Sequence, residues 1–204
     1  MRPEPGQVLH FSEDPNIKLF VPHVARTARQ QEPYVWAVDA ARSPDYWFPR
    51  NCPRALAWTT ASTTHHDRDR IIGPGCGDRV HAVEYRWLDA MRTVDLYAYR
   101  LPATAFEPFG TPVPTAQVAT EPVTPLGPPE RVGDLLRLHE KAGIHLRVLP
   151  NLWPFWDAVT ESTLSWSGIR LRNAIPRTRS ATEPAQEPVS RPGADSTPPR
   201  GTDP

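Results

Sequence analysis

The sequence has little cysteine, little lysine and no excess of either charge. Its 204 residues include two cysteines, and 23 basic residues balance 23 acidic ones. A net charge of zero gives no global electrostatic reason to expect nucleic acid or an anionic membrane as a partner. The basic residues are arginine apart from Lys18 and Lys141. GC-rich coding DNA explains this bias, so the many arginines do not by themselves indicate phosphate binding.

Long apolar runs and an apolar N-terminal segment are also absent. Pro3, Glu4 and Pro5 stand where a secretory signal would begin its apolar core. No segment approaches the roughly 18 uninterrupted apolar residues of a membrane span. Cys52 and Cys76 form no CxxC pair and are too few for a disulfide scaffold. We therefore expect a cytoplasmic protein with reduced thiols and no membrane contact, and we leave its oligomeric state open.

Strand and helix patterns are interspersed along the chain. Short apolar runs bounded by turn residues predict strands at 8–11, 35–38, 55–60, 96–101, 116–120, 144–149 and 167–173. Capping residues and helical spacing predict helices at 12–21, 78–91, 129–142 and 152–163. Such a mixture is typical of an α+β fold. We predict a single mixed-sheet domain over residues 1–174, with two to four helices.

Other stretches lack this periodicity. Residues 24–33 are polar and arginine-rich, and residues 61–77 combine Ser, Thr, His and Asp with glycines, so both predict loops. Residues 102–129 are dense in proline, which predicts extended loop around one short strand. From 175 to 204 almost no large apolar residue occurs, so burial cannot offset the entropy of ordering. We predict a disordered, proline-rich C-terminal tail.

The stretch 35–54, VWAVDAARSPDYWFPRNCPR, is rich in rings and guanidinium groups. After the strand, its prolines suit neither a regular helix nor a central strand. Arg50 and Arg54 can clamp a phosphate or carboxylate through paired hydrogen bonds, or can tie the loop to backbone carbonyls. Cys52 between them is more commonly an inert buried thiol than a nucleophile. The loop predicts one wall of a cleft for an anion or nucleotide.

Two side chains outside this stretch are candidates for chemistry. His10, in the first predicted strand, can hydrogen-bond a ribose or an amide, or can be a structural histidine. Glu84, predicted on a helix beside apolar positions, is a candidate general base. The alternative for Glu84 is a carboxylate paired with a nearby arginine such as Arg86.

Established catalytic motifs are missing from the sequence. It contains no P-loop, GxGxxG, GxSxG or HExxH pattern. The cluster of His65, His66, Asp67 and Asp69 lacks the ligand spacing of a preformed zinc site. We therefore predict no metal site, and a metal-dependent hydrolase using His65 and His66 is a minor alternative.

Several segments together resemble a family of uncharacterised bacterial proteins, a domain of unknown function. They are VLHFSEDPNIKLFVPH, VWAVD, YWFPRNCPR, RVHAVEYRWL, GIHLRVLPNLWP and STLSWSGIRLRNA. The resemblance covers residues 8–174. It implies no particular activity.

The opening LHFSEDPNI is more distantly similar to the start of ADP-ribosyltransferase-like folds, including the RNA 2′-phosphotransferase and DNA-modifying toxin branches. That resemblance implies that His10 contacts the ribose of NAD, that Tyr46 frames the nicotinamide and that Glu84 activates the acceptor. The paired Gln/Glu-x-Glu signature of those enzymes does not occur at Glu84, where Ala82 stands two positions earlier. Their glutamate also usually lies on a strand, whereas Glu84 is predicted on a helix.

These observations support two function classes. The first is a nucleotide-binding protein, with NAD as the candidate cofactor, in which His10, Tyr46, Arg50 and Arg54 bind the ligand and Glu84 and His10 are the catalytic candidates. The second is a non-catalytic interaction module that presents its proline-rich loop and tail as extended recognition segments. The sequence leaves open whether the protein is an enzyme.

Overall fold

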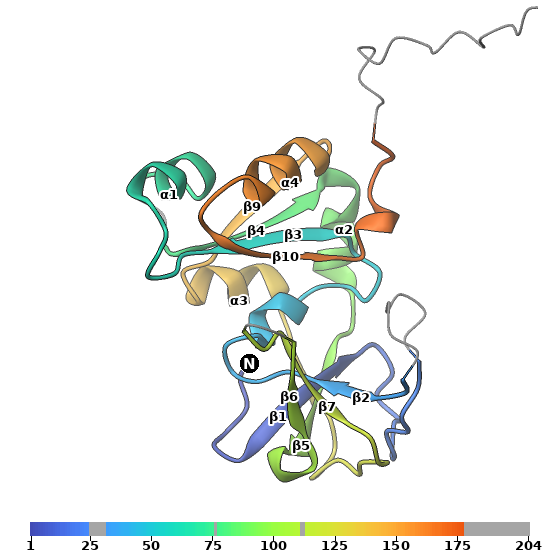
Figure 1. The fold of residues 1–204 in the computed structure, drawn as a ribbon. Helices are drawn as coiled ribbons and strands as arrows, with labels where there is room; N and C mark the ends of the chain where they lie inside the picture. Colours follow the sequence, from blue (N-terminus) through green and yellow to red (C-terminus); the bar gives the residue numbers. More distant parts are fainter. Residues whose placement is uncertain (25–31, 76, 111–112, 178–204) are drawn as a thin grey trace, which may run out of the picture.

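A computed structural model describes residues 1–24, 32–75, 77–110 and 113–177, whose strands form three sheets (Figure 1). The first sheet has the order β1 (Gln7–Ser12), β5 (Tyr97–Pro102), β8 (Glu130–Arg131). The second has the order β2 (Val35–Ala37), β7 (Ala116–Ala119), β6 (Glu107–Phe109). All pairs in both sheets are antiparallel. Reciprocal backbone hydrogen bonds between Leu9 and Val38 link the two sheets.

The third sheet is the largest and has helices on both sides. Its order is β10 (Ser165–Ile169), β3 (Arg54–Trp58), β4 (Arg79–Glu84), β9 (His145–Leu149). β4 and β9 are parallel, and the other pairs are antiparallel. Figure 1 shows α1 (His65–Ile71) and α4 (Trp153–Thr160) on one side of this sheet and α3 (Leu135–Lys141) on the other. The arrangement confirms the α+β mixed-sheet prediction.

Shorter helical elements connect these layers. α2 (Leu88–Thr93) follows β4 after a 3-10 turn, η2 (Tyr85–Trp87). The other 3-10 turns are η1 (Ser43–Tyr46), η3 (Ala103–Ala105) and η4 (Leu171–Asn173). Among the described residues, no helix has both the length and the apolar character that crossing a bilayer requires.

The two faces of β3 divide the core around the largest sheet. Leu56 packs in one cluster with Val83 and Leu135, whereas Ala55 and Ala57 pack in the cluster that contains α4. This split follows from the period of two along a strand. Small alanine side chains leave room for α4 to lie close to the sheet.

Most predicted strands are confirmed, with ends shifted by one or two residues. Those at 8–11, 35–38, 55–60, 96–101, 116–120 and 144–149 correspond to β1, β2, β3, β5, β7 and β9. The helices predicted at 129–142 and 152–163 are present as the shorter α3 and α4. Gly143, the residue after the C-cap Ala142 of α3, has a φ of 64°, as expected for a glycine that ends a helix.

The helix predicted at 12–21 is wrong. Ser12 Oγ accepts a hydrogen bond from the Asp14 amide at 3.1 Å, and Asp14 Oδ1 accepts one from the Asn16 amide at 2.8 Å. Such local side-chain bonds give the backbone partners that compete with a helix. The Tyr99 hydroxyl donates to the Asp14 carbonyl and accepts from the Ile17 amide, so the turn is held against β5.

The helix predicted from Asp78 to Met91 is also wrong. Residues 80–84 are buried in β4, which lies between β3 and β9, and the helical elements η2 and α2 begin only at Tyr85. A strand buried on both faces has apolar residues without strict alternation. The spacing of Val80 and Val83 is therefore compatible with either a helix or a buried strand. Glu84 lies on the strand β4, not on a helix.

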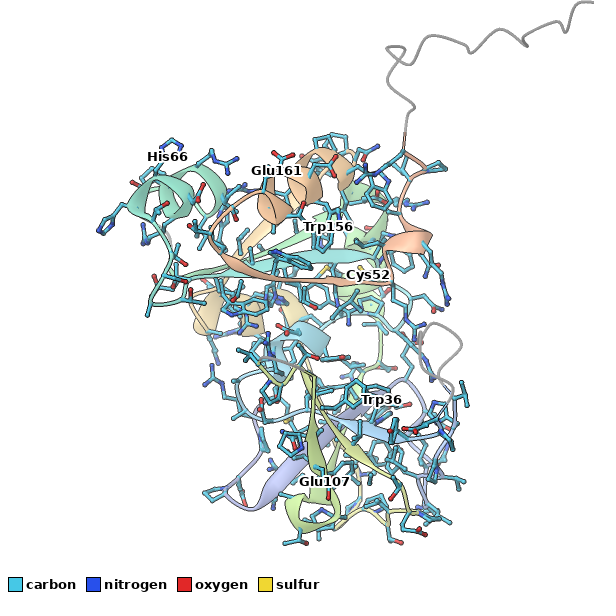
Figure 2. All side chains as sticks on the ribbon, in the orientation of Figure 1. Trp36, Cys52, His66, Glu107, Trp156 and Glu161 are labelled. Atoms are coloured by element: carbon cyan, nitrogen blue, oxygen red, sulfur yellow. The ribbon has the colours of Figure 1, made fainter. Side chains whose placement is uncertain are left out.

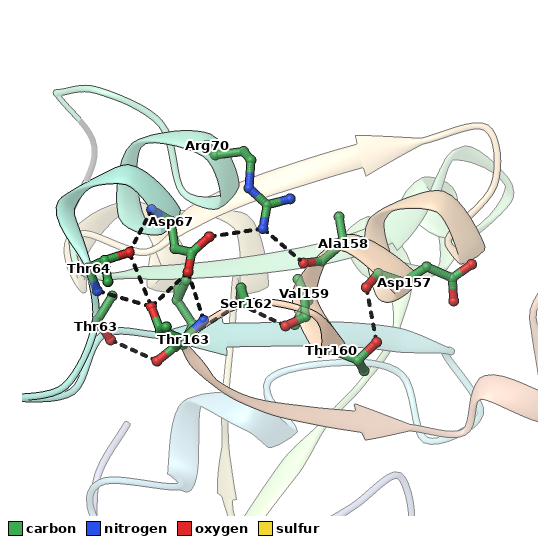
Figure 3. Close-up of polar contacts among 11 residues, drawn as sticks. Thr63, Thr64, Asp67, Arg70, Asp157, Ala158, Val159, Thr160, Ser162 and Thr163 are labelled. Carbon is green, nitrogen blue, oxygen red and sulfur yellow. Dashed lines mark hydrogen bonds and ion pairs between the residues drawn. The ribbon is translucent and has the colours of Figure 1, made fainter.

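The loop predicted at 61–77 contains α1, so that prediction is wrong in part. Thr64 caps α1 by accepting a hydrogen bond from the Asp67 amide at 3.2 Å. The Asp67 carboxylate accepts from the Thr163 amide at 2.9 Å and from Arg70 at 2.9 Å (Figure 3). These bonds, which lower the pKa of Asp67, fasten α1 to the turn before β10. Long-range polar contacts of this kind leave no local pattern.

The strand predicted at 167–173 ends at Ile169, because Arg170 has a left-handed backbone with φ of 57° and η4 follows.

The proline-rich stretch 102–129 is less loop-like than predicted. It contains β6 and β7, and it buries Phe106, Val118 and Val123. Packing against β2 explains why this stretch is structured despite its prolines.

Two predicted segments fall largely outside the described residues. They are the loop at 24–33, of which 25–31 is not described, and the tail, of which 178–204 is not described. Residues 175–177 are described and contact the domain. The Ile175 carbonyl accepts a hydrogen bond from Trp153 Nε1 at 2.7 Å.

Candidate functional site

A pocket of about 400 Å³ is lined by residues of β2, β6, β7, η1 and β10. Its wall includes Trp36, Arg42, Asp45, Tyr46, Phe109 and Ser167. The lining residues come from three separate parts of the chain, 36–46, 109–116 and 167–169, and the pocket forms because β10 and η1 come next to the sheet of β2, β7 and β6. A concave site with aromatic and charged lining is typical of small-molecule binding.

Aromatic rings give the pocket wall its shape. The rings of Trp36 and Phe109 meet edge to face with centroids 5.1 Å apart, and Tyr34 packs against both. Figure 2 shows Trp36 on β2, apart from Cys52 near the largest sheet. Tyr46 stacks on Phe11 of β1 at 6.5 Å. These contacts hold the rings in place in the pocket wall.

Positive charge exceeds negative charge around Asp45. The Asp45 carboxylate pairs with Arg79 and lies 3.6 Å from Arg42, and the charge of Arg54 also acts on it. Burial raises the pKa of Asp45, and the three guanidinium groups oppose that rise. Arg42 and Arg79 both lie over the ring of Trp58, at 4.2 and 5.0 Å. Three guanidinium groups thus act on the Asp45 carboxylate, and of these Arg42 lines the pocket.

Arg54 is a buried structural residue. Its Nε donates to the Asp45 carbonyl at 2.8 Å and its Nη1 to the Cys52 carbonyl at 3.0 Å. Its guanidinium lies 5.0 Å from the Phe48 ring centroid. The sequence left open whether Arg54 clamps an anion or ties the loop to backbone carbonyls, and these contacts are of the second kind. A direct role of Arg54 in ligand binding stays a prediction.

Arg50 has the opposite environment. Arg50 is exposed, and its backbone amide donates to Glu13 Oε1 at 2.8 Å. It takes part in none of the ion pairs found within the described residues. Because Glu13 directly follows β1, this contact places the loop of Arg50 beside the end of that strand.

His10 supports the strand that carries Trp36. Because a carbonyl only accepts, the Nδ1 of His10 donates to the Trp36 carbonyl, at 2.7 Å. Burial lowers the pKa of His10 to about 4, and the charge of Arg50 contributes to that shift. His10 is therefore neutral at pH 7. His10 does not line the pocket itself; its ring packs on Phe20, and its strand neighbour Phe11 is the residue that stacks on Tyr46.

Glu84 lies at the end of β4. It is fully buried, and its Oε2 accepts from Arg86 Nε at 2.8 Å. Its Oε1 accepts from the Ile175 amide at 2.9 Å. This is the arginine-paired alternative considered above, with an added backbone contact. Glu84 does not line the pocket, and its catalytic role stays a prediction.

The structure does not activate Cys52 as a nucleophile, and it does not assemble His65 and His66 into a metal site. Cys52 is buried, and burial raises the pKa of its thiol to about 12, which disfavours the nucleophilic thiolate. Cys76 lies outside the described residues. His65 and His66 are exposed on α1. Within the described ranges, no group of three His, Cys, Asp or Glu side chains is placed to hold a metal ion.

Sequence reasoning missed several residues of this site. Trp36 and Asp45 lie in the stretch singled out above but carried no separate signal. His81 and His139 lie 3.0 Å apart, nitrogen to nitrogen, although 58 positions separate them in the sequence. Only the packing of α3 against β4 brings such residues together.

Comparison with known proteins identifies a family. Residues 9–174 match a family of unknown function, DUF6886, and the chain belongs to that family. No curated protein and no solved structure matches the chain. The resemblance to an uncharacterised domain is therefore confirmed, and the more distant resemblance to ADP-ribosyltransferases finds no support in these comparisons.

Proposed function

We propose that the protein binds a nucleotide-like small molecule, such as NAD, in the pocket between Trp36, Tyr46 and Phe109. The single observation that carries the proposal is the pocket itself, about 400 Å³ in volume, with rings and a guanidinium group in one wall. A volume of a few hundred Å³ suits a ligand of nucleotide size. The cytoplasm, which holds the nucleotide pools, is the compartment that we assume.

The chemistry of the wall favours a ligand with a planar ring and a negative charge. Trp36 and Phe109 offer aromatic edges and faces for stacking. Arg42 lines the pocket, and the guanidinium groups near Asp45 outnumber its single carboxylate. An anionic group in the pocket offsets this positive excess.

His10, Tyr46 and Arg50 have distinct parts in this proposal. Tyr46 contacts the ligand directly, as a lining residue. His10 acts through the backbone of Trp36, to which it donates a hydrogen bond. Arg50 is exposed beside the end of β1, and it attracts an anionic group before that group enters.

Group transfer is not included in the proposal. In an ADP-ribosyltransferase-like cleft, Glu84 would face the ligand. Here both oxygens of Glu84 have hydrogen-bond partners, Arg86 and the Ile175 amide. We therefore propose that the pocket binds the ligand, and we propose no group transfer through Glu84.

The interaction module remains the rival function. Its proline-rich loop is partly folded, because β6 and β7 lie within residues 102–129 and Phe106 is buried. This leaves less extended backbone for a partner than the sequence predicted. We therefore favour the pocket.

A thermal-shift experiment on the full chain tests the proposal, with NAD, ADP-ribose and AMP as probes. A ligand at about 100 times its Kd stabilises the native state by about 2.7 kcal/mol. For a domain of this size the expected rise in Tm is about 5–10 °C. We expect a rise with at least one probe, and a smaller rise in Trp36→Ala and His10→Ala.

Trp166→Ala is the matched control. Trp166 is 46% exposed on β10 and packs against Trp156 of α4, so it does not line the pocket. The control should keep the wild-type response to the ligand. No rise with any nucleotide would reject the proposal and favour the interaction module. Unchanged binding in both Trp36→Ala and His10→Ala would reject the site.

A further inference from the structure

Three buried side chains form a chain of contacts that starts at the pocket wall. Asp45 on η1, His81 on β4 and His139 on α3 are 2%, 0% and 1% exposed. The Asp45 Oδ1 lies 3.7 Å from His81 Nε2, and His81 Nδ1 lies 3.0 Å from His139 Nε2. His139 Nδ1 in turn lies 2.7 Å from the Leu135 carbonyl.

The last of these contacts determines which ring nitrogens carry hydrogen. The Leu135 carbonyl can only accept, so His139 Nδ1 is the donor and its Nε2 is the acceptor when the ring is neutral. His81 Nδ1 must then donate to His139 Nε2. In neutral His81, this leaves an unprotonated Nε2.

That nitrogen faces the carboxylate with no hydrogen between them. His81 Nε2 is buried and forms no hydrogen bond with any described residue. A lone pair directed at an ionised carboxylate is unfavourable, and an orphaned buried polar atom is costly. One added proton, on the Asp45 carboxyl group or on His81 Nε2, supplies the missing hydrogen, and a hydrogen bond forms once the two atoms approach from 3.7 Å to about 2.8 Å.

We propose that Asp45 and His81 share one proton, so that Asp45 is the proton-transfer group of the pocket and His81 is its buried positioning partner. In the transfer, the Nε2–H bond of His81 breaks as the Oδ1–H bond of Asp45 forms, or the reverse. The bond from His81 Nδ1 to His139 keeps its hydrogen throughout. The role of Asp45 toward a ligand rests on the proposed function, whereas the shared proton does not.

The charges around the pair control how firmly the proton is held. Arg79 on β4, Arg42 beside η1 and Arg54 on β3 all act on Asp45 and oppose a further positive charge. Phe48 packs against both imidazole rings, at 5.6 and 4.9 Å between centroids, and Trp47 packs against His139 at 5.8 Å. An anion beside Arg42 offsets the guanidinium charge, so its binding favours uptake of the proton. The pair thus couples the charge of a ligand to a proton inside the protein.

NMR of the full chain without ligand tests the shared proton. Histidine ring nitrogens and aspartate carboxyl carbons are labelled, and spectra are recorded from pH 8 to pH 4. We expect the His81 nitrogen signals and the Asp45 carboxyl signal to move together with one midpoint, because strongly interacting groups titrate as a pair. Separate midpoints, or a His81 ring that stays neutral beside an ionised Asp45, would overturn the proposal.

Asp45→Asn gives a second, independent result. The asparagine amide can donate to His81 Nε2 without a titrating proton. We expect the His81 signals to lose the wild-type midpoint in this variant, and an unchanged His81 titration would also overturn the proposal. If Asp45→Asn does not fold, the wild-type titration decides alone. Because no ligand is present, a negative thermal-shift result for NAD leaves the NMR test unaffected.

Discussion

The imidazole Nδ1 of His81 lies 3.0 Å from the Nε2 of His139, and both rings are buried against Phe48. Burial lowers the pKa of His139 to about 4 and that of His81 well below its usual 6.5. Protonation of buried neutral histidines at low pH lowers the stability of the folded protein. The pair therefore links the stability of the domain to pH.

We predict that His139 makes the protein less stable between pH 6.5 and pH 4. The unfolded chain binds a proton near pH 6.5, whereas the folded chain binds it only near pH 4. The unfolded state holds more protons in this window, so the free energy of unfolding falls as pH falls. At pH 5 the loss due to His139 is about 2 kcal/mol relative to pH 8.

Urea unfolding of wild type and His139→Gln at pH 5, 6, 7 and 8 measures this effect. The variant should be less stable at pH 8, because it loses packing against Phe48 and Trp47. Its loss of stability between pH 8 and pH 5 should be smaller than that of wild type by about 2 kcal/mol. His66→Gln, an exposed substitution on α1, controls for the change of residue type. Equal pH dependence in wild type and His139→Gln would refute the prediction.

Glu84→Ala should destabilise the domain and loosen the segment after η4. The buried carboxylate accepts hydrogen bonds from Arg86 and from the Ile175 amide. Breaking a buried ion pair typically costs 3–5 kcal/mol, but the Arg86 side chain is 47% exposed, so we expect about 2–3 kcal/mol. Faster hydrogen exchange at the Ile175 amide is the specific signature.

Glu161→Ala is the control for the glutamate substitution, since Glu161 is exposed at the end of α4 (Figure 2). It should change stability by less than about 0.5 kcal/mol. An Ile175 amide that exchanges at the wild-type rate in Glu84→Ala would show that the carboxylate does not hold the segment.

Gly168→Ala should strain β10 beside the pocket. An added Cβ would lie 2.6 Å from Leu171 Cδ1 and 2.7 Å from Trp156 Cη2, which is closer than carbon atoms can approach. Overpacking of this kind costs about 1–3 kcal/mol. Thermal unfolding measures the loss, with Gly127→Ala as the control, because nothing lies within 4 Å of the Cβ at that position. Equal Tm values for the two variants would contradict the expected clash.

The candidate site was predicted only where its residues lie in one local stretch. The segment 35–54 pointed to Tyr46, which lines the pocket, by its unusual clustering of rings, prolines and guanidinium groups. The pocket residue Phe109 carried no signal, because it is one apolar residue among prolines. Its role appears only when β6 pairs with β7 beside β2.

By itself, the sequence determined the α+β class, most strands and the family. Alternating apolar residues and turn signals record local backbone preferences, and these persist in the fold. Only the tertiary structure decided that 79–84 is a strand, that Glu84 binds Arg86 and the Ile175 amide, and that His81 meets His139. These outcomes depend on burial from both sides and on contacts between distant residues. No local pattern encodes such contacts, because the free energy that selects them comes from packing.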